Sequence, residues 1–228
     1  MIGAPHVHHR VTDSTNERAR ALAEAGAPHG TIVTAGEQTA GRGRQGRTWT
    51  AAAGEALLLS AIVRGLEPRH ALLPLMAALA VCETAEAVAP VRCRIKWPND
   101  VWVERRKVSG ILVEARPAAG WAVVGIGLNT AVTRFPDELL ETATSLRLGS
   151  PWDALAPLAA ALERWTSAGA DEVLPAWRER DALLGSEVRW EGGEGTARGV
   201  DDGGSLLVET RDGELLTLGA GEVHLLRG

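Results

Sequence analysis

The chain of 228 residues is 45 % hydrophobic and 23 % charged, which is the composition of a globular protein with a substantial core. Its formal net charge of −5 argues against binding nucleic acid over the whole surface, although a local basic site is compatible with it. The N-terminus has no apolar signal-peptide segment, and no uninterrupted apolar run approaches the ~18 residues of a membrane span. We therefore expect a cytoplasmic protein that does not associate with membranes.

The first half of the chain predicts helices and strands in alternation. Ser14 and Glu17 form the S-x-x-E pattern of a capping box, in which each side chain accepts a hydrogen bond from a free backbone N–H at the start of a helix. The expected elements are a helix over residues 14–25, strands over 31–36 and 57–63, and a helix that begins at Pro68 and runs to about residue 89.

Four closely spaced strands and two helices are expected in the second half. The turns between the strands are too short for a parallel crossover, which needs a dozen or more residues, so neighbouring strands must be antiparallel. The strands are expected over residues 92–97, 100–104, 107–115 and 120–128, and the helices over about 152–167 and 171–183.

The C-terminal segment has a different pattern from the rest of the chain. Short β-rich runs alternate there with GG, DDGG and DG turns, which is typical of a small β-barrel. The sequence therefore predicts an α+β fold in two domains. Residues 1–184 would form a mixed, largely antiparallel sheet with flanking helices, and residues 185–228 a small barrel.

Scarce residue types indicate where the functional site lies. The chain has only two lysines against 22 arginines, with three asparagines and two glutamines. All seven scarce residues fall in the short, turn-rich segments DSTNE, GEQTAGRGRQGR, KWPND, RRKVSGILVE and GIGLN. Chance placement in a codon-biased chain is the alternative, but we interpret the clustering as a sign of chemistry in these segments. The residues are Lys96, Lys107, Asn16, Asn99, Asn129, Gln38 and Gln45.

A glycine- and arginine-rich loop over residues 41–47 predicts an anion site. Its G-x-G-x-x-G pattern does not open a helix, as a dinucleotide-binding loop would, and the chain has no Gly-Lys-Ser/Thr of a P-loop. Arg42, Arg44 and Arg47 offer fixed donor forks that stay charged, and the glycines let the loop fold over a phosphate or carboxylate. A solvated surface loop is the alternative.

Two lysines and one carboxylate make up the second candidate cluster. Lys96 ends one strand and Asp100 follows a proline turn, where it could hold Mg²⁺ or simply cap the turn. Lys107 begins the next strand, so its charge could reach a phosphate or a carboxylate from a rigid position. Gly110 lies inside that strand, where a missing side chain often marks the close approach of a ligand.

Cysteine and histidine show no arrangement for catalysis. Cys82 and Cys93 have no paired-motif spacing, so we favour buried free thiols, although a disulfide stays open. His6, His8 and His9 are expected on a solvated edge.

Segments along nearly the whole chain match one protein family in order and spacing. They are DSTN (13–16), EQTAGRGRQGRTW (37–49), KWPND (96–100), KVSGILVE (107–114), GIGLN (125–129), ATSL (143–146) and the C-terminal GAGEVHLLR. Together they resemble the biotin protein ligases, also called biotin–[acetyl-CoA-carboxylase] ligases. The resemblance implies a catalytic domain related to class II aminoacyl-tRNA synthetases and an SH3-like C-terminal domain.

The resemblance also implies a reaction. Biotin and ATP would form biotinyl-5′-AMP with release of pyrophosphate, and biotin would pass to a lysine of a biotin carboxyl carrier domain. Lys107, Arg42, Arg44 and Lys96 would be catalytic, because two anions must be brought together. Mg²⁺ would bridge phosphate oxygens beside Asp100, and the loop would close as a lid.

The family motifs carry over residue by residue onto this chain. The biotin site would comprise Ser14, Thr15, Asn16, Gln38, Gly41, Arg42, Gly43, Arg44, Trp49, Lys107, Gly110 and Leu112. The ATP site would comprise Arg42, Arg44, Arg47, Trp49, Lys96, Asn129, Thr144 and Ser145.

Some family members carry an N-terminal helix-turn-helix domain and repress biotin synthesis genes. Only about twelve residues precede DSTN here, so we expect a ligase without DNA binding, as a monomer or homodimer. A lipoate ligase would lack the GRGRQGR and KWPND pair, and an octanoyl transferase would need a catalytic cysteine. From another class, a non-catalytic RNA- or nucleotide-binding module could use the arginine loop.

Overall fold

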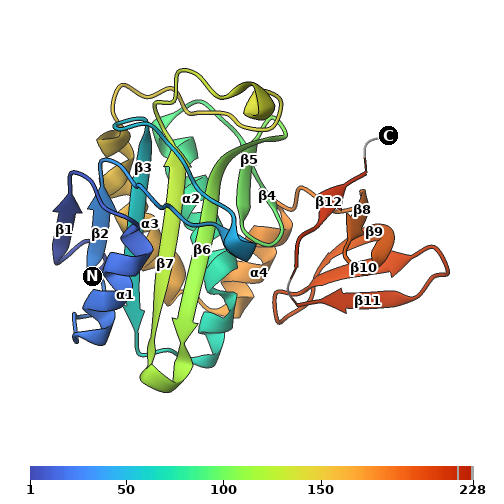
Figure 1. Ribbon diagram of the computed structural model, residues 1–228. Coiled ribbons are helices and arrows are strands. Elements are labelled where there is room, and N and C mark those ends of the chain that lie inside the picture. Colours follow the sequence, from blue (N-terminus) through green and yellow to red (C-terminus); the bar gives the residue numbers. More distant parts are fainter. Residues whose placement is uncertain (220, 227–228) are drawn as a thin grey trace.

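A seven-stranded sheet in the order β1-β2-β3-β7-β6-β5-β4 forms the centre of the main domain (Figure 1). The computed structural model describes residues 1–219 and 221–226. β1 is parallel to β2, and the other neighbours are antiparallel, which confirms the arrangement that the short turns predicted. The strands are β1 (His6–His9), β2 (Ile32–Ala35), β3 (Ala56–Arg64), β4 (Cys93–Lys96), β5 (Asp100–Val103), β6 (Arg106–Arg116) and β7 (Trp121–Asn129).

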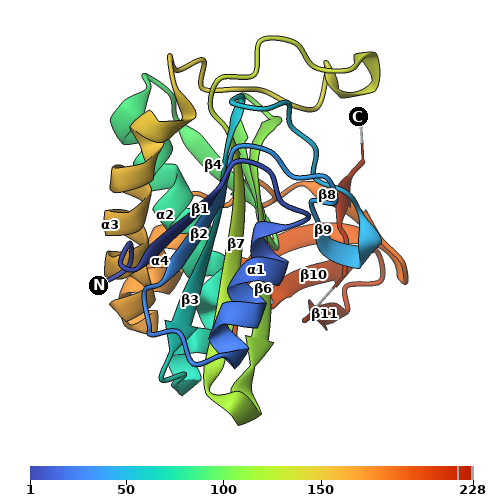
Figure 2. The ribbon, with the colours of Figure 1, turned by 60° about the vertical axis from the view of Figure 1, so that its left-hand side comes forward.

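Helices cover both faces of this sheet. α1 (Thr15–Glu24) lies on one face, and α2 (Leu73–Val88), α3 (Leu155–Ser167) and α4 (Ala170–Arg178) lie on the other (Figures 1 and 2). All four were expected, although α4 ends five residues before the predicted 183. Short 3-10 turns are η1 (Arg44–Gly46), η2 (Pro68–Leu72), η3 (Pro117–Ala119), η4 (Asp137–Leu139) and η5 (Pro151–Ala154).

The predicted capping box is wrong. Ser14 occupies the N-cap position of α1 with extended backbone angles, but its side chain accepts no capping hydrogen bond. Glu17 instead pairs with the guanidinium groups of Arg20 and Arg42, each at 2.5 Å. Charge-assisted bonds to arginine are stronger than bonds to a backbone N–H, so they take the glutamate away from the cap.

The N-terminal strand β1 was not predicted. His6 and His8 are exposed on it, as expected of a solvated edge, and both contact the hydroxyl of Thr34, at 2.7 and 3.0 Å. A four-residue edge strand rich in histidine carries too little apolar alternation to be recognised.

Side chains of β3 and β7 alternate between the two faces of the sheet. The face covered by α2 carries Leu57, Leu59, Ala61, Val63, Ala122, Val124, Ile126 and Leu128. On the other face, Ile62 and Val123 pack against α1. Farther along the same face stand Ser60, Gly125 and Gly127. These residues are too small to fill the space, so the strands leave room there for the candidate site.

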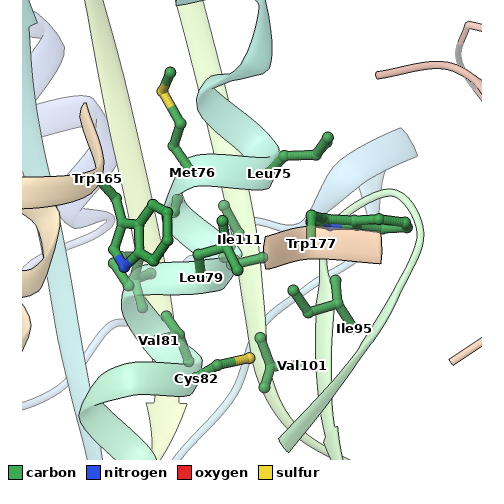
Figure 3. Packing of buried hydrophobic residues seen from close by; sticks show 14 of the residues in the cluster. Leu75, Met76, Leu79, Val81, Cys82, Ile95, Val101, Ile111, Trp165 and Trp177 are labelled. Carbon is green, nitrogen blue, oxygen red and sulfur yellow. The ribbon is translucent and has the colours of Figure 1, made fainter. Parts of the chain in front are cut away.

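The helix α2 is the centre of the main core. Figure 3 shows Met76, Leu79 and Cys82 of α2 among residues from the sheet and from α3 and α4. Pro68–Val88 is also the one described segment whose length and hydropathy would allow a membrane span, but 67 % of its most apolar window is buried inside the fold. Such burial is what a core helix requires, so the segment is weak grounds for a membrane span.

Both cysteines are buried free thiols within the described part of the chain, which confirms the favoured interpretation. Cys82 lies on α2 and Cys93 begins β4. Burial, with the neighbouring Cys93 thiol, raises the pKa of Cys82 well above its usual value. A thiol held in this neutral form is a poor nucleophile, so it acts as a small core residue.

The short strands predicted for the C-terminal domain form one antiparallel sheet of their own, which does not close into a complete barrel within the described residues. Its order is β11-β10-β9-β8-β12, with antiparallel neighbours. No pairing joins β11 to β12 among residues 1–219 and 221–226. β12 offers only two residues, and these pair with β8. The strands are β8 (Glu187–Trp190), β9 (Gly193–Val200), β10 (Leu206–Thr210), β11 (Leu215–Leu218) and β12 (His224–Leu225).

This sheet packs against the main domain through one continuous core. Val188, Val208 and Val223 belong to the same buried cluster as the residues of α2. The indole Nε1 of Trp97 donates a hydrogen bond to the carbonyl of Gly204 at 3.0 Å. The expected boundary at residues 184–185 lies in the connection between α4 and β8.

Asp181 lies in the segment between α4 and β8, and its burial predicts a stability that depends on pH. The residue is 2 % exposed, its Oδ1 accepts the N–H of Leu183 at 2.8 Å, and its Oδ2 has no partner among the described residues. Burial raises the pKa of Asp181. The folded state therefore favours the protonated carboxyl group, and this contribution to stability is complete below the unfolded-state pKa. It is lost as the pH rises through the folded-state pKa.

We expect Asp181→Asn to stabilise the protein near pH 7 by about 1 kcal/mol, because it removes a buried charge that lacks a full set of partners. Urea unfolding at neutral and acid pH tests this prediction. The difference from wild type should vanish in acid, and a difference independent of pH would contradict it.

Candidate active site

A cavity of about 640 Å³ opens on the face of the sheet where β6 and β7 carry glycine. The loop over residues 42–52 and the segment 132–143 contribute its other walls. It gathers most of the residues predicted for the site. These are Ser14, Thr15, Asn16, Gln38, Arg42, Gly43, Arg44, Arg47, Trp49, Lys96, Asp100, Lys107, Gly110, Leu112 and Asn129.

Glycines make the floor of the cavity. Gly110 of β6 lies directly opposite Gly127 of β7 in the register, and Leu112 lies opposite Gly125. A methyl group on Gly127 would overlap the indole of Trp49, and one on Gly125 would overlap the amide of Asn16. At Gly110, where the sequence predicted the close approach of a ligand, the missing side chain leaves room for Trp49 and Lys107.

A β-bulge brings Lys107 onto this floor. Residues three apart in a regular strand face opposite sides, but the register shifts opposite Val101 and Trp102, so Lys107 and Gly110 share one face. The Nζ atom of Lys107 lies 2.6 Å from Oδ1 of Asp100 and 5.6 Å from the ring centre of Trp49. Lys107 is therefore held by a carboxylate on one side and an aromatic face on the other.

Hydrogen bonds fix the polar end of the cavity. Oε1 of Gln38 accepts both the backbone N–H and the hydroxyl of Thr15, at 2.7 and 3.0 Å. The hydroxyl of Ser60 donates to Oδ1 of Asn16 at 2.6 Å. Sequence reasoning missed Ser60, and the signal was its position as the one polar residue inside the apolar run 57–63.

The arginines of the loop pair with groups of the protein itself. Arg42 lies between Glu17, at 2.5 Å, and Glu114, at 3.4 Å. Arg47 pairs with Glu222, which lies just before β12, at 2.6 Å. An anionic ligand would have to compete with these carboxylates for the guanidinium groups.

Arg44 lies between the other two arginines and has a different partner. Its guanidinium donates to Oδ1 of Asn99 at 3.4 Å. Burial and the neighbouring charge of Arg47 lower its pKa. A half-buried guanidinium whose partner is a neutral amide is free to bind an anion at little cost in lost ion pairs.

Lys96 adds a second lysine to the same wall. Burial lowers its pKa, against the opposing effects of the Asp100 and Glu222 carboxylates. Its Nζ lies 5.5 Å from the ring centre of Trp102. Glu222 thus approaches both Lys96 and Arg47 from the C-terminal sheet, which the GAGEVHLLR motif alone did not predict.

Asn129 holds the segment after β7 against β6. Its Nδ2 donates to the carbonyl of Thr144 at 3.1 Å, and the backbone of Lys107 exchanges hydrogen bonds with Thr142 and Thr144. Thr142 and Ala143 line the cavity, whereas Thr144 and Ser145, which the sequence predicted for the site, do not. Gly41 lies outside it as well, beside a neighbouring cavity of about 910 Å³.

The side chains present fit a metal that arrives with a nucleotide. No group of three or more His, Cys, Asp or Glu residues is placed to hold a metal in the part of the chain that the structure describes. Mg²⁺ takes one or two carboxylates plus substrate phosphates, and Asp100 supplies one such carboxylate.

Comparisons with known proteins place the chain in a family. The model of the Biotin/lipoate A/B protein ligase family matches residues 8–130, and that of the Biotin protein ligase C terminal domain matches residues 183–226. The chain belongs to the biotin protein ligase family. The ligase is 38 % identical to the Biotin--[acetyl-CoA-carboxylase] ligase of Mycobacterium tuberculosis, over 95 % of this chain and 87 % of that protein.

Two further relatives support this placement. The ligase is 34 % identical to the Bifunctional ligase/repressor BirA of Bacillus subtilis, over 93 % of this chain and 72 % of that protein. The solved biotin protein ligase from Aquifex aeolicus in complex with biotin and ATP superposes with a TM-score of 0.80 at 30 % identity, covering 99 % and 100 % of the two chains. The predicted family and α+β fold are thereby confirmed, and the chain is a ligase.

Proposed function

We propose that this ligase joins biotin to ATP to give biotinyl-5′-AMP and pyrophosphate, and then transfers biotin to a lysine of a biotin carboxyl carrier domain. The observation that carries the proposal is the position of Lys107. Lys107 lies on the glycine floor of the cavity. The same cavity is lined by the polar residues Thr15, Asn16 and Gln38 at one end and by the arginine loop. The cavity therefore offers hydrogen bonds for a polar ring and cations for phosphate.

Biotin would lie along the floor. Its ureido ring needs donors and acceptors, which Ser14, Thr15, Asn16 and Gln38 can supply. Its hydrocarbon chain needs apolar contacts, which Leu112 can supply beside the glycines. The carboxylate would then end near Lys107. Hydrogen bonds at the polar end would hold the carboxylate of biotin beside Lys107, and such positioning lowers the entropic cost of the reaction.

In the first step, a carboxylate oxygen of biotin attacks the α-phosphorus of ATP. A bond forms between this oxygen and the α-phosphorus. The bond between the α-phosphorus and the oxygen shared with the β-phosphate breaks, and pyrophosphate leaves with the electron pair. Lys107, Arg42, Arg44 and Lys96 stabilise the charge that builds up on phosphate. Bound Mg²⁺ would neutralise phosphate charge, and Asp100 is the carboxylate placed to hold it.

In the second step, the neutral amine of the carrier lysine attacks the carbonyl carbon of the mixed anhydride. An amide bond forms, AMP leaves with the electron pair, and the amine loses a proton. Until then the anhydride must be kept from water. The loop over residues 41–49, with Trp49 packed on the floor, would serve as the lid that excludes it.

Arg44→Gly should loosen this lid. The variant removes a half-buried guanidinium and adds backbone freedom, so we expect biotinyl-5′-AMP to escape and label lysines indiscriminately. Mass spectrometry of an unrelated bystander protein in the reaction measures this labelling. Modification confined to the carrier domain would contradict the proposed lid.

Transfer is tested with a recombinant biotin carboxyl carrier domain, ATP, Mg²⁺ and equal amounts of biotin, lipoate or octanoate. We expect one biotinyl group per carrier and none on a carrier whose acceptor lysine is arginine. Modification with lipoate or octanoate instead would favour the related acyl ligases, and no modification at all would favour a binding module.

A further inference from the structure

Every polar atom of the Asn16 side chain has a partner within the protein. Its Nδ2 donates to Oε2 of Glu114 at 2.8 Å and to the carbonyl of Leu112 at 3.3 Å. Its Oδ1 accepts the hydroxyl of Ser60 at 2.6 Å. Asn16 is 4 % exposed, so its amide is reached almost only from the cavity that it lines.

These partners decide which end of the amide is which. A rotation of the amide by half a turn would exchange an acceptor for a donor at nearly the same shape. The hydroxyl of Ser60 can donate or accept, so it suits either orientation. Glu114 is different, because a carboxylate only accepts and binds an N–H more strongly than a neutral carbonyl does. Together with the longer bond to Leu112, it holds the NH₂ group on its own side.

The oxygen of Asn16 consequently lies over the cavity floor. A methyl group on Gly125 would overlap Oδ1, and both residues line the cavity. The oxygen of Gln38 nearby is already occupied by two donors of Thr15. One lone pair of Oδ1 remains after Ser60, so this end of the cavity offers an acceptor to a ligand N–H.

We propose that Glu114 is a positioning residue that sets ligand specificity by locking the Asn16 amide with its oxygen toward the cavity. The lock selects a ring that presents an N–H donor at this point, as a ureido group does, over one that presents only acceptors. The inference rests on the proposed binding of biotin and adds the group that orients its contact.

Glu114 also contacts Arg42, at 3.4 Å, so a second explanation of its importance must be separated from the first. Glu17 contacts the same guanidinium more closely, at 2.5 Å, and makes no contact with Asn16 among the described hydrogen bonds. Glu17→Gln is therefore the matched control, since it removes a carboxylate partner of Arg42 and leaves the hydrogen bonds of the Asn16 amide intact.

The experiment measures biotin binding calorimetrically, without ATP, for the full-length wild type, Glu114→Gln, Glu114→Leu and Glu17→Gln. We expect Glu114→Leu to weaken binding about tenfold, because Nδ2 loses its charged acceptor. Glu114→Gln should stay within about threefold of wild type, since its amide oxygen can still accept the N–H. Glu17→Gln should bind as wild type does.

A biotin methylated on its ureido nitrogens provides a readout that does not depend on how much of a variant is folded. Wild type should prefer biotin over this analogue, and Glu114→Leu should lose most of that preference. An unchanged preference in Glu114→Leu, or a loss of biotin affinity in Glu17→Gln as large as in Glu114→Leu, would overturn the inference. If wild type itself fails to bind biotin, the proposed function fails instead.

Discussion

Lys107→Ala is expected to reduce the rate of biotinyl-5′-AMP formation by about 10³-fold, while the melting temperature changes little. Lys107 is the cation on the cavity floor, and removing a group aimed at developing charge costs on the order of 10²–10³ in rate. The variant also removes the ammonium group that pairs with Asp100 at 2.6 Å. Single-turnover formation of the adenylate measures the effect.

Arg106→Ala is the matched control for this variant. Arg106 precedes Lys107 on β6, but it pairs with Glu104 and does not line the cavity. We expect its rate to stay near that of wild type, whereas Lys107→Arg should fall between the two because it keeps the charge in a different shape. A Lys107→Ala variant with more than a tenth of the wild-type rate would remove Lys107 from the mechanism.

The second large effect is expected for Gly125→Ala, which should weaken biotin binding by up to about 100-fold. The new methyl group would overlap the amide oxygen of Asn16, and that amide is tied to Ser60 and Glu114. Overpacking of this kind costs about 1–3 kcal/mol, and here the cost falls on the ligand contact itself. Calorimetric titration with biotin measures the loss.

Gly149→Ala is the control, because a methyl group there meets no atom within 4 Å. Both variants should unfold cooperatively, since neither glycine has the positive φ that would make alanine strained. Biotin binding by Gly125→Ala at wild-type strength would show that the floor beneath Asn16 does not hold the ligand.

The sequence predicted the antiparallel core of the sheet, and most of the site residues that it predicted line one cavity. Rarity singled out Lys107, Asn16 and Gln38, which line the cavity, together with Gln45, which is exposed in η1 and does not line it. The short turns between β4 and β7 were sufficient to fix strand direction, because chain geometry leaves no parallel solution.

The features that escaped prediction depend on contacts between distant residues. Arg47 and Glu222 are 175 positions apart, so no local pattern could reveal their ion pair. Glu17 does not cap α1 but forms ion pairs with Arg20 and with Arg42 of the loop. The bulge that turns Lys107 toward the floor leaves no mark in the strand pattern of KVSGILVE. The pairing of β12 with β8 joins the two ends of the C-terminal domain, which the pattern of short strands did not specify.

Biotin-dependent exchange of radiolabelled pyrophosphate into ATP is the most direct test of the central claim. The assay needs only the chain, biotin, ATP and Mg²⁺, so it isolates the first step from any carrier protein. We predict exchange that requires biotin, is not supported by lipoate, and is lost in Lys107→Ala. Exchange that proceeds equally without biotin, or no exchange by the wild type with biotin present, would contradict the account.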